Sequence, residues 1–141
     1  MDDKGRVSVP AKFRDFLLAA SAGRVVITNF FSESARCLDA YPYPAWVEFE
    51  KRLRERPQFD NKMMRFQNYY LAGAHECEID KQGRILLPPA LRTYAGLARD
   101  VTFVGIGEKF RIWDRGVWTK VFADSEQAFM DDPGMLSDLG I

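Results

Sequence analysis

The sequence has few of the residues that build metal centres and thiol chemistry. Its 141 residues include two cysteines, Cys37 and Cys77, and one histidine, His75. A zinc site needs about four ligands at paired spacings, and two cysteines do not form a disulfide framework. None of the three residues lies in a local nucleophile motif. The sequence therefore predicts free thiols, no metal, no cofactor, no small-molecule substrate and no enzyme.

Long apolar runs and an excess of one charge are also absent. No segment approaches the roughly 20 apolar residues of a membrane span, and the first residues are charged where a signal peptide is apolar. We therefore expect a cytoplasmic protein without a membrane partner. Twenty basic and 20 acidic residues give a net charge of zero, so binding to nucleic acid would need a local basic surface.

The charge is unevenly distributed along this neutral chain. Residues 1–14 contain two lysines and two arginines against two aspartates, whereas residues 124–141 contain five acidic residues and no basic one. A 47% hydrophobic composition suits one compact domain, or two halves that share a core. A basic surface is thus available at the start of the chain, and the acidic tail would lie away from any nucleic acid.

One thirteen-residue phrase occurs twice. Residues 2–14 read DDKGRVSVPAKFR, and residues 80–92 read DKQGRILLPPALR. The phrase aligns Asp2 with Asp80, Gly5 with Gly83, Arg6 with Arg84, Pro10 with Pro88 and Arg14 with Arg92. Similar strand and helix patterns follow each copy. Two copies predict a fused pseudo-dimer, in which each unit runs turn, strand, short helix, two strands and helix, and the halves complete one core.

The repeated turn has a local chemical logic. Gly5 and Gly83 are expected at positive φ, which lets a tight turn place the arginine that follows. Arg6 and Arg84 would then present guanidinium groups, the preferred bidentate donors to phosphate or to a base edge. Local pairing of each arginine with Asp2 or Asp80 is the alternative, and the two interpretations are compatible because a carboxylate can orient an arginine that binds a ligand.

A helix is expected at residues 45–56, at the end of the first repeat. A second, near 60–72, would link the two repeats, and a third is expected in the tail until residues 131–134. The aromatic residues of these regions suit either stacking platforms or core, and their spacing favours core: Trp46, Tyr69, Tyr70, Trp113 and Trp118. Met63, Met64, Phe66 and Tyr70 are candidates for a subunit interface. Closing the core between the two halves is the alternative role for these four residues.

The phrase, joined to LAGAHECEIDKQGRILLPPALRTYAGL at 71–97, closely resembles the MraZ family, bacterial regulators of the division and cell-wall gene cluster. Each unit resembles the AbrB-type swapped-hairpin DNA-binding fold. The resemblance implies an α+β chain with a mainly β core, in which two AbrB-like repeats form a pseudo-two-fold, β-barrel-like monomer with flanking helices. We expect a first repeat at 1–56, a linking helix at 57–73, a second repeat at 74–123 and an acidic, partly helical tail at 124–141.

The same resemblance implies a sequence-specific transcriptional regulator. It would bind direct repeats in double-stranded DNA upstream of its own operon, form a homo-oligomeric ring and associate with the nucleoid in the cytoplasm. The residues implied in DNA contact are Arg6 and Arg84, with Lys4, Lys12 and Lys81 nearby. Those expected to orient the motif are Asp2, Asp80, Gly5 and Gly83. The alternative is an antitoxin-like AbrB relative whose main partner is a protein toxin, although a complete second unit argues against it.

The first repeat departs from the family pattern. The family has a strand before each motif, as AHECEI at 74–79 precedes the second one, whereas the first motif begins at Asp2. Either the start lies upstream or the first unit lacks this strand. In the second case we expect an unpaired strand edge.

Overall fold

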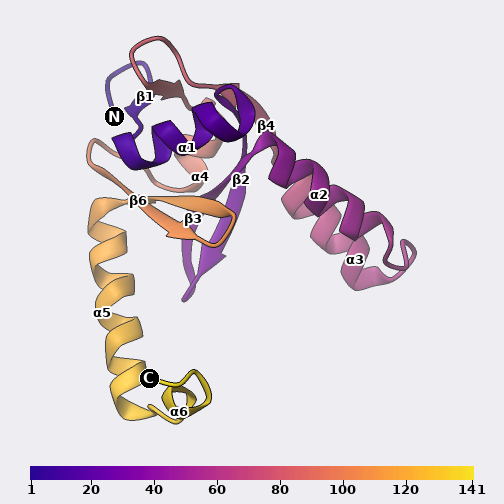
Figure 1. The fold of residues 1–141 in the computed structure, drawn as a ribbon, viewed down its shortest axis with the longest axis vertical. Coiled ribbons are helices and arrows are strands. Elements are labelled where there is room, and N and C mark those ends of the chain that lie inside the picture. Colours follow the sequence, from indigo (N-terminus) through magenta and orange to yellow (C-terminus); the bar gives the residue numbers. More distant parts are fainter.

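Short strands and helices alternate along both halves of the chain. The computed structural model describes residues 1–141 as a mixed α+β fold (Figure 1). The strands are β1 (Arg6–Ser8), β2 (Arg24–Ser32), β3 (Ala35–Pro42), β4 (His75–Glu78), β5 (Arg84–Leu86), β6 (Val101–Ile106) and β7 (Lys109–Asp114). The helices are α1 (Ala11–Ser21), α2 (Tyr43–Arg54), α3 (Asn61–Phe66) with the π-helical turn η1 (Gln67–Leu71), α4 (Pro89–Tyr94), α5 (Arg115–Asp131) and α6 (Met135–Asp138).

The strands form two antiparallel sheets, and both repeats contribute strands to each sheet. The larger sheet has the order β4-β2-β3-β7-β6, so β3 of the first repeat lies beside β7 of the second. The smaller sheet is the β1–β5 pair, with Val7 opposite Ile85. The larger sheet ends at β4 and β6 instead of closing on itself. The structure therefore confirms the α+β class but not the β-barrel-like arrangement.

The edge of the sheet at β6 agrees with the absence of a strand before the first motif. β6 pairs with β7 alone, whereas its counterpart β2 pairs with both β3 and β4. The Met1 ammonium donates to the Arg99 carbonyl just before β6. In the same way, the Ile79 N–H donates to the Gly23 carbonyl just before β2, at 3.0 Å. Within residues 1–141 the outer edge of β6 is unpaired.

One face of the larger sheet packs against the β1–β5 pair, α1 and α4. Alternate residues of each strand point to this face, and together with both short helices they form a single core: Val7, Val9, Leu17, Val25, Ile27, Leu38, Ala40, Ile85, Leu87, Leu91, Ala95, Leu97, Phe110 and Ile112. Both repeats contribute, as the duplication predicts. Helix α1 turns Phe13 and Leu17 toward this core and leaves Phe16 46% exposed.

The other face of the sheet carries an aromatic cluster under α2 and η1. Trp46 and Tyr70 are buried there, and the Phe66 ring stacks on Tyr70 at 5.0 Å. Phe66 and Tyr70 therefore belong to the core of the chain rather than to an exposed interface. Met64 remains 47% exposed. Trp113 is also buried, under α5, so the core interpretation of the aromatic residues holds for these tryptophans.

A buried carboxylate lies at the centre of this second face. The Asp39 side chain on β3 is fully buried and accepts hydrogen bonds from Lys109 Nζ and Arg111 Nε, both at 2.9 Å. The Tyr70 hydroxyl donates to the same carboxylate at 2.6 Å. Burial and the Asp39 charge raise the pKa of Tyr70, which keeps its proton available for donation. This network ties η1 and β7 to the middle of the sheet.

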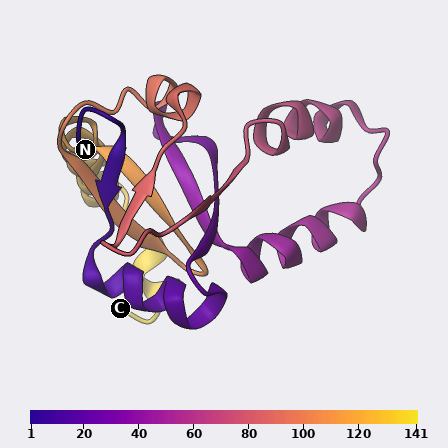
Figure 2. The same cartoon turned by 90° about the horizontal axis from the view of Figure 1, so that it is seen from above.

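Two helical projections leave the sheet body in different directions. α2 and α3 form a hairpin on one side, and α5 extends away from the sheet, with α6 folded back at its tip (Figures 1 and 2). The first part of α5 packs through Val121 onto Trp113 and Cys37. None of the helices combines the length and the apolar composition that crossing a lipid bilayer requires.

Candidate nucleic-acid interface

The two repeated turns are bonded into a single unit. Gly5 and Gly83 adopt φ values of +87° and +76°, as predicted. Each turn is then fixed to the strand of the other repeat, because Leu87 N–H donates to the Gly5 carbonyl and Val9 N–H to the Gly83 carbonyl, both at 2.9 Å. The duplicated phrase therefore places its two copies side by side across the β1–β5 pair.

The aspartates of the phrase organise these turns from within. Asp2 Oδ1 accepts the backbone N–H of Arg6 at 2.9 Å, and Asp80 Oδ1 accepts that of Arg84 at 2.9 Å. A second N–H, two residues after each aspartate, donates to the same oxygen. These bonds favour the charged carboxylates: the Arg6 N–H lowers the pKa of Asp2 to about 2, and the Arg84 N–H lowers the pKa of Asp80. Both aspartates are ionised at neutral pH.

The guanidinium groups of Arg6 and Arg84 lie beside these carboxylates. Arg6 Nε donates to Asp2 Oδ2 at 2.6 Å. Arg84 Nε lies 3.4 Å from Asp80 Oδ2, and its Nη1 lies 3.9 Å from Asp2 Oδ2. The local pairing considered from the sequence is therefore present. The two side chains still keep 33% and 27% of their surfaces exposed, so an arginine can be oriented by its aspartate and still reach a ligand.

Arg14 and Arg92 cross between the repeats. A Cβ added at Gly5 would lie 2.5 Å from Arg92 Cζ, and one added at Gly83 would lie 2.8 Å from Arg14 Cδ. The last arginine of each phrase thus lies against the glycine of the other phrase. Neither arginine forms an ion pair, and both are half-buried. We interpret them as positioning residues that pack the two turns together.

This packing makes Gly5→Ala an informative variant. A methyl group at Gly5 would strain a positive φ and displace the Arg92 guanidinium, so we expect a loss of about 1–3 kcal/mol in unfolding free energy. We also expect weaker binding to any ligand of the turns. Gly96→Ala is the matched control, since Gly96 also has a positive φ, +61°, but has nothing within 4 Å of an added Cβ.

Urea unfolding and ligand titration of both glycine variants separate the two effects. The Gly96 variant should lose stability and keep normal binding, whereas the Gly5 variant should lose both. Equal binding by the two variants would show that the Arg92 contact does not position the turn.

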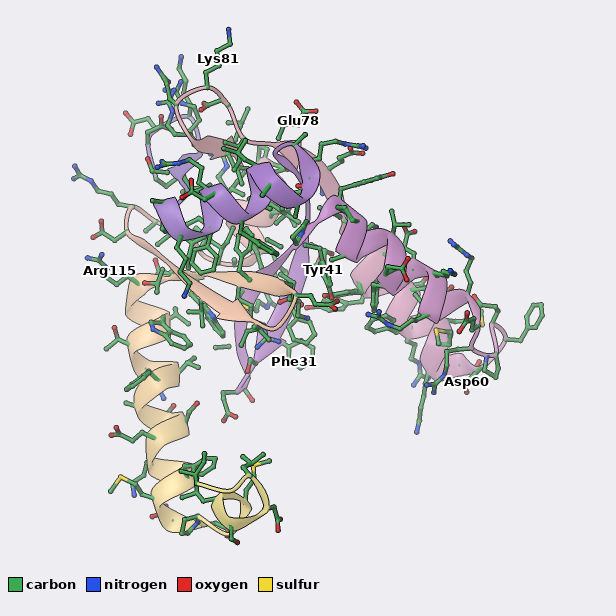
Figure 3. All side chains as sticks on the ribbon, viewed as in Figure 1. Phe31, Tyr41, Asp60, Glu78, Lys81 and Arg115 are labelled. Atoms are coloured by element: carbon green, nitrogen blue, oxygen red, sulfur yellow. The ribbon has the colours of Figure 1, made fainter.

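The predicted lysines lie in different places. Lys4 and Lys81 are exposed at the turns, and Figure 3 shows Lys81 at the outer tip of its turn. Lys12 lies on α1, in a hollow that it shares with Phe16 and Lys109. The structure therefore brings Lys4 and Lys81 together with the two arginines and places Lys12 in another hollow.

The residues considered for metal or thiol chemistry lie apart from the turns. The structure contains no group of three or more His, Cys, Asp or Glu side chains that could hold a metal ion. His75 Nδ1 lies 3.0 Å from the Gly73 carbonyl. Burial raises the pKa of Cys37 to about 12 and that of Cys77 to about 11. Both thiols are therefore protonated at neutral pH, which is unfavourable for a nucleophile.

Two further arginines lie near the turns and were not identified from the sequence, because they are not part of the repeated motif. Arg99 and Arg115 line a hollow of about 340 Å³ together with Arg6 and Arg84. Arg99 precedes β6 and Arg115 begins α5, both outside the duplicated phrase. The signal that could have found them is a difference between the repeats, namely an arginine in one where the other has an unrelated residue.

Comparison with known proteins places the chain in a family of two-repeat proteins. The family model described as "MraZ protein, putative antitoxin-like" matches residues 1–68 and again residues 70–137. The duplication seen in the sequence is thus a duplication of the whole family unit. The chain belongs to the MraZ family.

Several relatives are similar over most of the chain. "Transcriptional regulator MraZ" of Thioalkalivibrio sulfidiphilus is 46% identical over 120 residues, covering 85% of this chain and 78% of the relative. The protein of the same name from Nitrosomonas europaea is 40% identical over 118 residues, covering 84% and 78%. That of Halorhodospira halophila is 39% identical over 145 residues, covering 100% and 94%.

Proposed function

We propose that this chain is a non-enzymatic transcriptional regulator that binds double-stranded DNA through its paired turns. The observation that carries the proposal is the bonding of two Asp–Arg turns into one unit, with Arg6 and Arg84 presented beside each other. Arginine is the side chain best suited to bidentate contact with a guanine edge in the major groove. The names of the relatives, which describe transcriptional regulators, support the same function.

The fold gives the proposal a symmetric geometry. We propose that the repeats are AbrB-like swapped hairpins, related by a pseudo-two-fold axis through the β1–β5 pair. Equivalent hydrogen bonds on both sides support this, since Gly5 N–H donates to the Asp2 carbonyl at 3.1 Å and Gly83 N–H to the Asp80 carbonyl at 3.0 Å. Asp2, Asp80, Gly5 and Gly83 set the turn, Arg6 and Arg84 read bases, and Lys4 and Lys81 attract phosphates. Lys12 would contribute only if the duplex also reached α1.

The proposed targets are direct repeats upstream of the protein's own operon, bound by a ring of copies in the cytoplasm and associated with the nucleoid. A neutral chain with a few basic residues at each turn would bind a single site weakly. A ring engages neighbouring sites together, and the second contact becomes intramolecular. This can raise avidity by about 10²–10⁴ without a new kind of contact.

Titration against upstream DNA with one repeat and with several repeats tests the proposal. Wild type should prefer the upstream sequence over random DNA and should prefer tandem over single sites. Phe59 is 94% exposed and Met64 47% exposed on the α2–α3 hairpin, so we expect Phe59→Glu with Met64→Glu to give a folded monomer. That monomer should bind one repeat almost normally and lose its preference for tandem sites.

Leucine at both positions is the matched control, because it keeps the surface apolar, and sedimentation reports the assembly state of each variant. A wild-type monomer that still preferred tandem repeats would disprove the avidity mechanism. Wild type with no preference for upstream DNA would disprove the proposed function itself.

The antitoxin-like alternative remains worth one measurement, because the family description contains that term. A toxin partner would be expected on a C-terminal segment that folds on binding. Here residues 115–131 already form the continuous helix α5. Co-purification of a small protein in stoichiometric amount would favour the alternative over DNA binding as the main function.

A further inference from the structure

A basic hollow extends the paired turns to one side. Its volume is about 340 Å³, and the charged residues that line it are Arg6, Arg84, Arg99, Arg115, Asp2 and Asp100. The backbone N–H of Arg115 donates to the Asp100 carbonyl at 2.9 Å, which fixes the start of α5 to the loop before β6. Four guanidinium groups, from four separate elements or loops, thus meet around one opening.

The arginines of this hollow fall into two kinds. Arg6 and Arg84 lie within 4.0 Å of Asp2, so its carboxylate is already engaged. Arg99 and Arg115 are exposed, and neither forms an ion pair; Figure 3 shows Arg115 at the top of α5, on the outer side of the sheet body. The hollow therefore holds two uncompensated cations next to the two arginines of the turns. Phosphate is the ligand that this arrangement suits.

The first repeat has no counterpart of Arg99. The Met1 ammonium, directly before the first turn, donates to the Arg99 carbonyl. The Ile79 N–H, directly before the second turn, donates to the Gly23 carbonyl. Gly23 therefore occupies the position in the first repeat that Arg99 occupies in the second, and it brings no charge.

The first repeat also lacks a counterpart of Arg115. Arg115 begins α5 directly after β7, whereas Tyr43 begins α2 directly after β3. The arginine on that side, Arg24, lies 3.7 Å from the Tyr43 ring centre and donates to Glu76 at 2.8 Å. Glu78 lies opposite Arg24 in the β2–β4 register. One side of the paired turns is thus basic and open, and the other is neutralised by glutamates.

We propose that Arg99 and Arg115 bind DNA backbone phosphates on one side of the paired turns and so give each protomer a direction on the duplex. This rests on the proposed DNA-binding function. Two equivalent turns alone could bind a site in either direction, because the axis that relates them also reverses the duplex. Phosphate contacts on one side break this equivalence. Copies arranged in one direction then match direct repeats rather than inverted ones.

The test uses a double variant that carries both Arg99→Ala and Arg115→Ala. Its binding to upstream and to random DNA is compared with that of wild type. Each lost phosphate contact makes the slope of log affinity against log salt less steep by about 0.9, so we expect a change of about 1.8. Affinity should fall by the same factor on both DNAs, since phosphate contacts are not sequence-specific. Lysine at both positions should keep most of the slope. Arg54→Ala with Arg56→Ala removes two exposed arginines from the hairpin and should leave the slope unchanged.

Neutral methylphosphonate linkages placed on one flank of a single site test the direction. We expect weaker wild-type binding when one particular flank is neutralised and little change for the other flank. The Arg99 and Arg115 double variant should be indifferent to both. An unchanged salt slope, or equal sensitivity of wild type to the two flanks, would overturn this inference while specific binding still supported the proposed function. If wild type itself showed no preference for the upstream sequence, both the proposed function and this inference would be wrong.

Discussion

Asp39→Ala should destabilise the protein by about 3–5 kcal/mol, the largest effect we expect from a single substitution. Removing one member of a buried ionic network leaves its partners charged and uncompensated. Lys109 and Arg111 keep only 20% and 17% of their side-chain surfaces exposed, so water compensates them poorly. The Tyr70 hydroxyl would also lose its acceptor. Urea unfolding, with the change in midpoint converted to free energy, measures the loss.

Asp124→Ala is the matched control for Asp39→Ala. Asp124 accepts from Lys120 at 2.6 Å, but this pair lies exposed on α5, and exposed pairs contribute little. Replacing Asp39, Lys109 and Arg111 together by apolar residues should recover part of the lost stability, because no charge is then left buried. If Asp39→Ala unfolded no more easily than Asp124→Ala, the network would not stabilise the sheet.

Arg6→Ala and Arg84→Ala should each weaken specific DNA binding by roughly 1–3 kcal/mol if the arginine reads a base edge. The loss should appear on the upstream sequence and be smaller on random DNA. Both side chains lie near Asp2, so their effects should not be strictly additive. Fluorescence anisotropy with the two DNAs at several salt concentrations gives the affinity and the salt slope together.

Lysine at position 6 or 84 is the control, because it keeps the charge and loses the bidentate geometry. A base-reading arginine should be poorly replaced by lysine. If an arginine touches only phosphate, affinity should instead fall equally on all sequences and the salt slope should shrink. Normal binding of the upstream DNA by both folded alanine variants would show that neither turn contacts DNA.

Much of this arrangement follows from the duplicated phrase. The glycine between Asp and Arg in each copy predicts a positive φ, and both Gly5 and Gly83 show it. The apolar positions that match between the copies become one core shared by the two repeats, because Val7 pairs with Ile85. Local chemistry was enough here, since turn geometry and strand alternation depend on neighbouring residues.

Other parts depend on contacts that no local pattern encodes. Asp39 lies in an ordinary alternating strand, and its cationic partners come about 70 residues later in the chain. Arg14 and Arg92 act on the opposite repeat, so their role is visible only once the two turns are placed together. A β-barrel-like arrangement was expected, but β1 and β5 form a separate two-stranded sheet. The hollow around Arg99 and Arg115 depends on where the repeats differ, which a search for similarity does not examine.

For the proposed DNA binding, the hydrogen bonds from Leu87 to Gly5 and from Val9 to Gly83 limit which duplex the paired turns can accept. They fix the separation of Arg6 and Arg84, because neither turn can shift without breaking the β1–β5 pair. Such a preorganised pair of turns loses little conformational entropy on binding, but it cannot change its spacing to fit a duplex with a different helical twist. In the proposed complex the adjustment would therefore fall on the DNA, and base steps that no side chain touches would influence affinity through their flexibility. The choice of target site would thus depend on the flexibility of the base pairs between the contacted ones as well as on the identity of the contacted bases.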